Sequence, residues 1–272
     1  MMSRHDPAAA APRRNTVRVI LAILGLLLIV LFAGLGTWQV VRLQWKLALI
    51  ERVESRVHAA PVLPPPAARW AQVSKDSDEY RHVRLAGHFL YEFTTPVQAV
   101  SELGAGFWLV TPLCGTDGSI VLVNRGFIPS TGNTAARFPA RRASEDACAA
   151  AASGTPHTLT GLLRIAEPGG GFLRDNDPVR NRWFSRDVAG IAAARGLSPV
   201  APYFIDAAKG QEPAGAPDNP VGGLTVISFP NNHLVYAGTW YALALMVAGA
   251  WWYIARLGKR EAGTARNNGS KV

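Results

Sequence analysis

The chain has 272 residues, a formal net charge of +9 and two cysteines, and hydrophobic residues make up 49% of it. Charged residues make up 17%, which is below the ~25% typical of soluble proteins. This composition excludes a wholly disordered chain and a disulfide-rich scaffold.

The basic excess lies at the two ends of the chain. Residues 1–60 carry eight Lys or Arg against three Asp or Glu, and residues 256–272 carry five against one. Residues 61–255 hold fifteen of each sign. Because the middle of the chain is neutral, it does not offer a basic surface to polyanions, and we exclude nucleic acid as a partner.

The first expected element is a transmembrane helix over residues 18–38, preceded by a basic segment, residues 1–17. No charged residue lies between Arg18 and Arg42, and about 20 apolar residues suffice to cross the hydrocarbon core of a bilayer. A cleaved signal peptide is the alternative, but its apolar region is typically only ~7–15 residues long and a small-residue cleavage site follows it. Since neither feature matches, we expect an uncleaved anchor.

Residues 39–232 are expected to form one α+β domain with an antiparallel sheet or small barrel. Helical spacing continues from Trp38 to His58, and a proline-rich segment, residues 60–67, then ends the helix. β-Branched and aromatic segments bounded by turn residues predict the strands. The expected strands are residues 81–90, 106–113, 120–128, 158–165, 203–206 and 224–228. One helix is expected over residues 185–196, with Ser185 as its N-cap and Gly196 as its terminator.

The two cysteines leave a disulfide open. Residues 130–156 are rich in alanine and read as a loop insertion, and Cys148 lies within it. In an oxidising compartment Cys148 could pair with Cys114, but its loose surroundings argue against a designed bridge. The two do not form a C-x-x-C motif, so redox exchange and covalent haem attachment are not indicated.

A second transmembrane helix is expected over residues 233–255, followed by a basic tail, residues 256–272. Residues 234–255 are uncharged, and aromatic residues near both ends resemble interfacial belts. A buried core helix is the alternative. Because basic residues precede the first span and follow the second, the positive-inside rule places both termini in the cytoplasm. The central domain would then face the periplasm of a bacterial inner membrane.

Signatures of enzymes are absent from the sequence, including a P-loop, a G-x-S-x-G elbow and a dinucleotide fingerprint. His82 and His88 lie in one expected strand with about 20 Å between their Cα atoms, which is too far for one metal ion. Asp175 and Asp177 lie among arginines in a segment that Asx turns and salt bridges explain. We therefore expect no catalytic residue, and no metal site apart from the haem site considered next.

His233 lies immediately before the uncharged stretch of the second span, residues 234–255, and so at the outer interface of the membrane. Neutral imidazole is a good axial ligand for haem iron, and Trp240 could pack against a porphyrin. The alternative is an interfacial anchor, in which Asn231 and Asn232 cap the helix and His233 contacts the headgroups. The residues alone leave both interpretations open.

Five segments resemble, in order, the motifs of the surfeit locus protein 1 family. They are LGTWQVVRLQWK (35–46), EYRHVRLAGHF (79–89), GFWLVTPL (106–113), VLVNRGFIP (121–129) and PNNHLVYAGTWYALA (230–244). The resemblance covers most of residues 35–256 and includes the two-span topology. Residues 130–156 carry no such motif.

The resemblance implies a membrane-bound, non-enzymatic assembly factor for haem-copper cytochrome c oxidase, which acts while haem a enters subunit I. Some bacterial members are described as binding haem a through the histidine of the last motif, which is His233 here. The implied partners are oxidase subunit I, haem a synthase and the lipid bilayer. The alternative is a scaffold for oxidase subunits or haem a synthase that does not itself bind haem.

Two further expectations rest on this reading. Arg42 could pair with a haem propionate, because a guanidinium suits carboxylate geometry; a snorkelling anchor is the alternative. The small-residue rows Gly238/Ala242 and Ala244/Ala248 are expected to let the first span approach the second closely. Gln39 is expected at the same membrane depth as His233.

Overall fold

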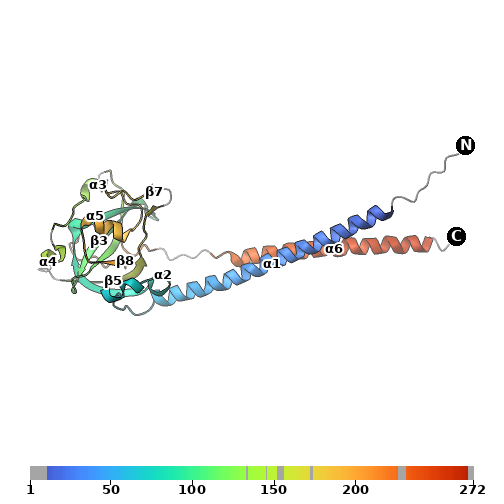
Figure 1. Cartoon of the computed structure of the whole chain (residues 1–272), viewed down its shortest axis with the longest axis horizontal. Helices are drawn as coiled ribbons and strands as arrows, with labels where there is room; N and C mark the ends of the chain where they lie inside the picture. The colour runs from blue at the N-terminus through green and yellow to red at the C-terminus, as the bar shows by residue number, and fades with distance from the viewer. Residues whose placement is uncertain are drawn as a thin grey trace. The chain divides into compact units, whose positions relative to one another are not determined.

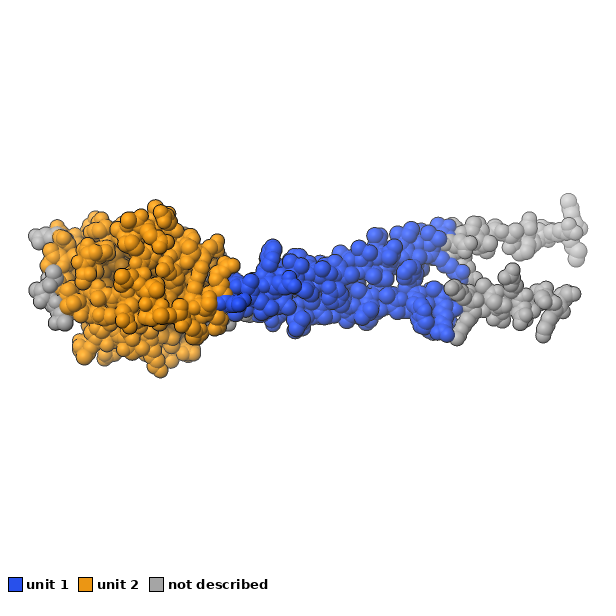
Figure 2. Space-filling view, turned by 90° about the horizontal axis from the view of Figure 1, so that it is seen from below, with its two compact units in different colours: residues 1–51, 228–272 blue, residues 52–227 orange. Residues whose placement is uncertain are grey.

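The computed structural model describes residues 11–132, 134–144, 146–151, 156–171, 174–225 and 231–268. The chain divides into two units, coloured separately in Figure 2. The first unit comprises residues 1–51 and 228–272, and the second comprises residues 52–227.

Two long helices, α1 (Ala11–Val57) and α6 (His233–Asn268), supply the first unit, and α1 continues into the second (Figure 1). Each contains a stretch long and apolar enough to cross a membrane, within Thr16–Val57 and His233–Leu257. Only 6% and 11% of these apolar windows are buried inside the protein, so neither is the core helix of a soluble domain. The chain is therefore membrane-associated, and the expected helical extension beyond Trp38 is confirmed.

The second unit is a small β-barrel with one added strand. Its strands are β1 (His82–Phe89), β2 (Thr95–Ser101), β3 (Gly104–Gly115), β4 (Ile120–Pro129), β5 (His157–Ile165) and β8 (Val200–Ala207). The order β1-β5-β8-β4-β3 closes through a β1–β3 ladder, and β2 lies beside β3 at the edge. The expected α+β class, with two apolar helices flanking a small barrel, is confirmed.

One ladder of the barrel differs from the expected antiparallel sheet. β4 and β8 pair in parallel, whereas the other barrel ladders are antiparallel. The connection from β4 to β8 is long and includes β5 and helix α5 (Val188–Arg195). Parallel neighbours need such a crossover, and the pattern within each strand does not reveal it.

The remaining elements are short. They are η1 (Ala67–Gln72), α2 (Lys75–Asp78), η2 (Tyr91–Phe93), α3 (Thr134–Arg137), α4 (Ala147–Ala151) and the hairpin β6 (Gly170–Gly171) with β7 (Arg174–Asp175). Cys148 of α4 forms a disulfide with Cys114 of β3, so the pairing that the sequence left open is present. The bridge ties part of the expected loop insertion to the barrel.

The core explains why β4 reads as an unbroken apolar run. Val121 and Val123 belong to a cluster drawn from all five barrel strands, which fills the barrel interior. Leu122 between them points outward into a second cluster, together with Trp183 and Ile191 of the covering segment and helix. Because β4 is buried on both faces, alternation disappears from its sequence.

Strand β2 was not expected, and the expected strand at residues 224–228 is not found where it can be described. Pro96 lacks the N–H that a ladder needs, and proline is tolerated in strands mainly at a sheet edge, which is where β2 lies. Leu224 and Thr225 are not in a strand, and residues 226–228 lie outside the described residues.

The ends of α5 correct one expectation and confirm another. The N-cap is Asp187, whose carboxylate accepts from the backbone N–H of Gly190. Ser185, the expected cap, instead donates its hydroxyl to the carbonyl oxygen of Glu167. Gly196 ends the helix in the left-handed conformation, as expected.

A buried charged cluster holds the segment before α5 against the barrel. The carboxylate of Asp206 accepts from Asn124 at 2.7 Å, Arg164 at 3.0 Å and Arg186 at 3.2 Å. Burial alone would lower the pKa of Arg164, but attraction to Asp206 and neighbouring groups raises it overall. The guanidinium therefore stays charged inside the cluster, and each buried ion has a partner.

We expect Gly87→Ala to destabilise the barrel. A Cβ at this position would lie 2.0 Å from the carbonyl oxygen of Cys114, across the ladder that closes the barrel. Overpacking of this kind costs about 1–3 kcal/mol, so the Tm of the full-length protein should fall. Gly132→Ala is the matched control, because nothing lies within 4 Å of its Cβ position. Equal Tm values by tryptophan fluorescence would contradict the close approach.

We also expect an alkaline loss of stability that depends on Tyr203. Its buried hydroxyl donates to the carbonyl oxygen of Pro65 at 2.9 Å, and burial raises the pKa of Tyr203 to about 12. The pKa of tyrosine in the unfolded chain is about 10. The neutral hydroxyl of Tyr203 therefore contributes fully to the free energy of unfolding below about pH 10, and this contribution is lost as the pH rises towards 12. The Tm of Tyr203→Phe should fall less steeply over that range. Parallel curves for the two proteins would rule out the contribution.

Candidate functional site

His233 is the first residue of α6, and its side chain contacts α1. Its Nδ1 lies 2.8 Å from Oε1 of Gln39. With the amide of Gln39 in this orientation its oxygen faces the ring and can only accept, so the contact corresponds to the tautomer with the proton on Nδ1 and the lone pair on Nε2. Histidines that bind metals typically donate their second ring N–H to an acceptor in this way, which fixes the tautomer and the ring orientation.

Other contacts between the two helices follow the same face of α6. The hydroxyls of Thr37 and Tyr241 lie 3.0 Å apart. The rings of Phe32 and Trp240 stack with their centroids 5.7 Å apart. His233, Ala237, Trp240, Tyr241 and Ala244 share one helix face by their spacing, and Ala237 and Ala244 are both buried.

Only one of the two expected small-residue rows, Ala244/Ala248, lies on the face of α6 that contacts α1. Ala244 is buried and Ala248 is half-buried. Gly238 is exposed, with nothing within 4 Å of its Cβ position, and Ala242 is exposed too. The close approach instead comes from α1, where a Cβ on Gly36 would lie 2.9 Å from the Tyr241 ring.

The other expected site residues have structural partners. The guanidinium of Arg42 lies 5.8 Å from the ring centroid of Trp38 and 6.0 Å from that of Trp45, within range of cation–π attraction. Its pairing with a propionate stays a prediction, as does contact between Trp240 and a porphyrin. The side-chain oxygen of Asn231 is buried without a partner among the described residues, so it does not cap α6.

The donor set fits haem iron better than a bare metal ion. Within the described ranges, three or more His, Cys, Asp or Glu side chains are nowhere gathered as metal ligands. A protein-bound metal ion needs several such ligands, whereas haem iron takes its in-plane ligands from the porphyrin and needs only axial ligands from the chain. Axial ligation of haem iron by His233 stays a prediction.

Gln39 was assigned no role from the sequence. The signal for it is an amide side chain at the end of an otherwise apolar span, beside Trp38 and Thr37. Polar side chains in such a position commonly form hydrogen bonds to a neighbouring helix. The partner itself depends on how α1 and α6 face each other, which the order of residues does not give.

These features define a membrane-associated protein that carries a small β-barrel between two apolar helices. The SURF1 family model matches residues 26–245. Surfeit locus protein 1 of Mus musculus is 36% identical over 235 residues, which cover 80% of this chain and 70% of the mouse protein. The human protein is 36% identical over 236 residues, covering 80% and 72%. The SURF1-like protein of Monosiga brevicollis is 34% identical over 243 residues, covering 85% of each chain.

The chain therefore belongs to the SURF1 family. This is a family of cytochrome c oxidase assembly factors. The resemblance seen in the five sequence motifs is confirmed.

We expect Gly36→Ile to separate α1 from α6 near Tyr241. The added side chain would overlap the Tyr241 ring and weaken the helix contact by about 1–3 kcal/mol. A Phe32→Cys/Trp240→Cys pair reports the separation through a short bismaleimide, because the two native cysteines are joined in a disulfide.

The matched control is Gly34→Ile in the same cysteine background, since nothing lies within 4 Å of its Cβ position. Cross-linking should fall for Gly36→Ile and persist for Gly34→Ile. The same yield in both variants would contradict the helix contact described above.

Proposed function

We propose that this protein handles haem a during assembly of cytochrome c oxidase and assists its insertion into subunit I, with His233 as an axial ligand of the haem iron. Membership of the SURF1 family supports the role in oxidase assembly. The observation that carries the haem role is the hydrogen bond from Nδ1 of His233 to Gln39. It leaves the lone pair on Nε2, the atom that iron requires.

The side chains proposed for the site suit an apolar, planar cargo with carboxylate arms. Haem iron supplies redox chemistry when it is bound. Gln39 holds the imidazole in one tautomer, so the ring does not have to reorient when iron binds. Trp240 offers an aromatic face, and Arg42 offers a guanidinium for a propionate. Haem a synthase and oxidase subunit I are the partners that would deliver and receive this cargo.

We place the protein in the inner membrane of a bacterium, with both termini in the cytoplasm and the barrel in the periplasm. The basic residues that precede α1's apolar stretch and follow that of α6 support this orientation. The disulfide between Cys114 and Cys148 supports an oxidising compartment for the barrel.

The test is the amount of haem a per oxidase subunit I in membranes of a strain that lacks the protein, complemented with variants. Reduced-minus-oxidised spectra measure haem a, and immunoblots measure subunit I. His233→Ala should fail to restore occupancy. His58→Ala is the matched control, because this exposed histidine lies beyond the apolar part of α1 and outside the helix pair.

Gln39 gives a second, graded test. Gln39→Leu removes the acceptor, and loss of such a partner typically weakens metal binding about tenfold to a hundredfold. Gln39→Glu keeps an acceptor oxygen and should restore binding. Full haem a occupancy with both His233→Ala and Gln39→Leu would refute haem ligation by His233 and favour the scaffold that never touches haem.

A further inference from the structure

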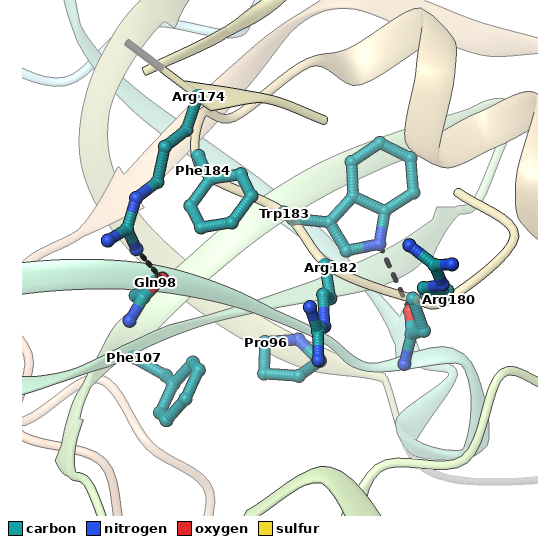
Figure 3. Close-up of a pocket in the computed structure, with 9 residues that line it drawn as sticks. Pro96, Gln98, Phe107, Arg174, Arg180, Arg182, Trp183 and Phe184 are labelled. Carbon is teal, nitrogen blue, oxygen red and sulfur yellow. Dashed lines mark hydrogen bonds between the residues drawn. The ribbon is translucent and has the colours of Figure 1, made fainter. Parts of the chain in front are cut away.

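The barrel unit holds a cavity of about 690 Å³ beside strand β2 (Figure 3). Its size lies within the ~300–1,000 Å³ typical of ligand pockets. β2 supplies Pro96 and Gln98, and β3 supplies Phe107. The segment 174–184, whose first part the sequence indicates only as a turn, lies along the free edge of β2, where the backbone N–H of Gln98 donates to the carbonyl oxygen of Trp183. This segment supplies most of the polar groups.

The polar lining is cationic. Arg174, Arg180 and Arg182 line the cavity, and its described lining includes no carboxylate. Arg180 reaches Asp177 at 3.5 Å while remaining largely exposed, and Arg174 donates to the amide oxygen of Gln98 at 3.3 Å. The guanidinium of Arg182 forms no salt bridge in the part of the chain that the structure describes. Charge of this kind suits carboxylates, which guanidinium groups bind in a bidentate manner.

The apolar lining is held rigidly in place. The guanidinium of Arg174 lies 5.4 Å from the ring centroid of Phe184. The buried Trp183 donates to the side-chain oxygen of Asn181 at 3.0 Å, and that oxygen also accepts from the buried Arg195 at 2.9 Å. A wall fixed by buried hydrogen bonds loses little entropy when a ligand binds, which favours affinity.

The surface extends beyond the cavity as exposed apolar side chains. Val100 lies two residues past Gln98 on the same face of β2, and the residue is 83% exposed. Val179 lies in the turn that carries Arg180 and is 94% exposed. Arginine and aromatic side chains are enriched at protein interfaces, and the two valines add exposed apolar area beside them. A small ligand confined to the cavity would leave both valines uncovered.

We propose that this cavity and its two valines form a docking site for an acidic segment of a partner protein. Carboxylates of the segment pair with Arg174 and Arg182, and one aromatic or aliphatic side chain enters the cavity against Phe107 and Phe184. Charge complementarity and the exposed valines select a polypeptide as the occupant. The site lies wholly within the barrel unit and does not depend on haem binding by His233.

Fluorescence anisotropy of the full-length protein in detergent tests the proposal, with a labelled peptide in which glutamates flank a single tryptophan. Arg182→Glu should weaken binding at least about tenfold, because it removes a charge-assisted pair and adds repulsion. Arg84→Glu is the matched control, since Arg84 is exposed on β1 and does not line the cavity. It should change binding by no more than about twofold. Tm values confirm that both variants fold.

Two further arms identify the occupant. Val100→Asp should weaken peptide binding, and a peptide with glutamine in place of glutamate should not bind. Equal losses for Arg182→Glu and Arg84→Glu would show unspecific attraction and overturn the proposal. So would the absence of peptide binding, or equally tight binding of indole-3-propionate alone, which would make the cavity a site for small anions.

Discussion

The barrel depends on one long strand, β3, which forms hydrogen bonds to two different strands along the same edge. β3 pairs with β2 over residues 104–110 and with β1 over residues 113–115. The register of the β3–β4 ladder shifts between Trp108 and Val110, and such irregularities increase the local twist of a strand. The ladder that closes the barrel uses the C-terminal end of β3, so β2 stays outside the barrel. The outer edge of β2 is then free to bind the backbone of Trp183, which places the arginine-rich segment beside β2.

Much of the barrel can be predicted from sequence because each strand carries its own signal. β4 is a continuous apolar run, and the turn between β3 and β4 has the composition of a hairpin. Two features escape this reasoning. β2 contains Pro96 and is half-exposed, so its pattern is weak, and the parallel β4–β8 ladder depends on where distant strands meet. Neither the disulfide nor the cationic cavity follows from local pattern, because each joins segments far apart in the chain.

The helix pair shows a similar limit at the level of single side chains. Composition suffices to locate two spans and to single out His233 at the start of the second. It does not give the rotation of α6 about its own axis, so Gly238 was placed at the interface where Ala237 lies instead. For the same reason the sequence indicates the depth of Gln39 but not its hydrogen bond to His233. The sequence gives the positions of the two helices along the chain, and the structure adds which side chains of each helix face the other.

The hydrogen bond between His233 and Gln39 also bears on whether His233 has a structural role or is a ligand of haem iron. In an apolar setting an imidazole and an amide satisfy each other, and this alone would stabilise the helix pair. A purely structural bond would be served equally well by any donor and acceptor of suitable length. A ligand role makes a stricter demand, because the proton must stay on Nδ1 so that Nε2 keeps its lone pair. The amide oxygen of Gln39, as it faces Nδ1, sets that tautomer, whereas the opposite orientation would present the amide NH2 to Nδ1. The orientation of this amide is therefore the feature of the helix pair that favours haem ligation over mere packing.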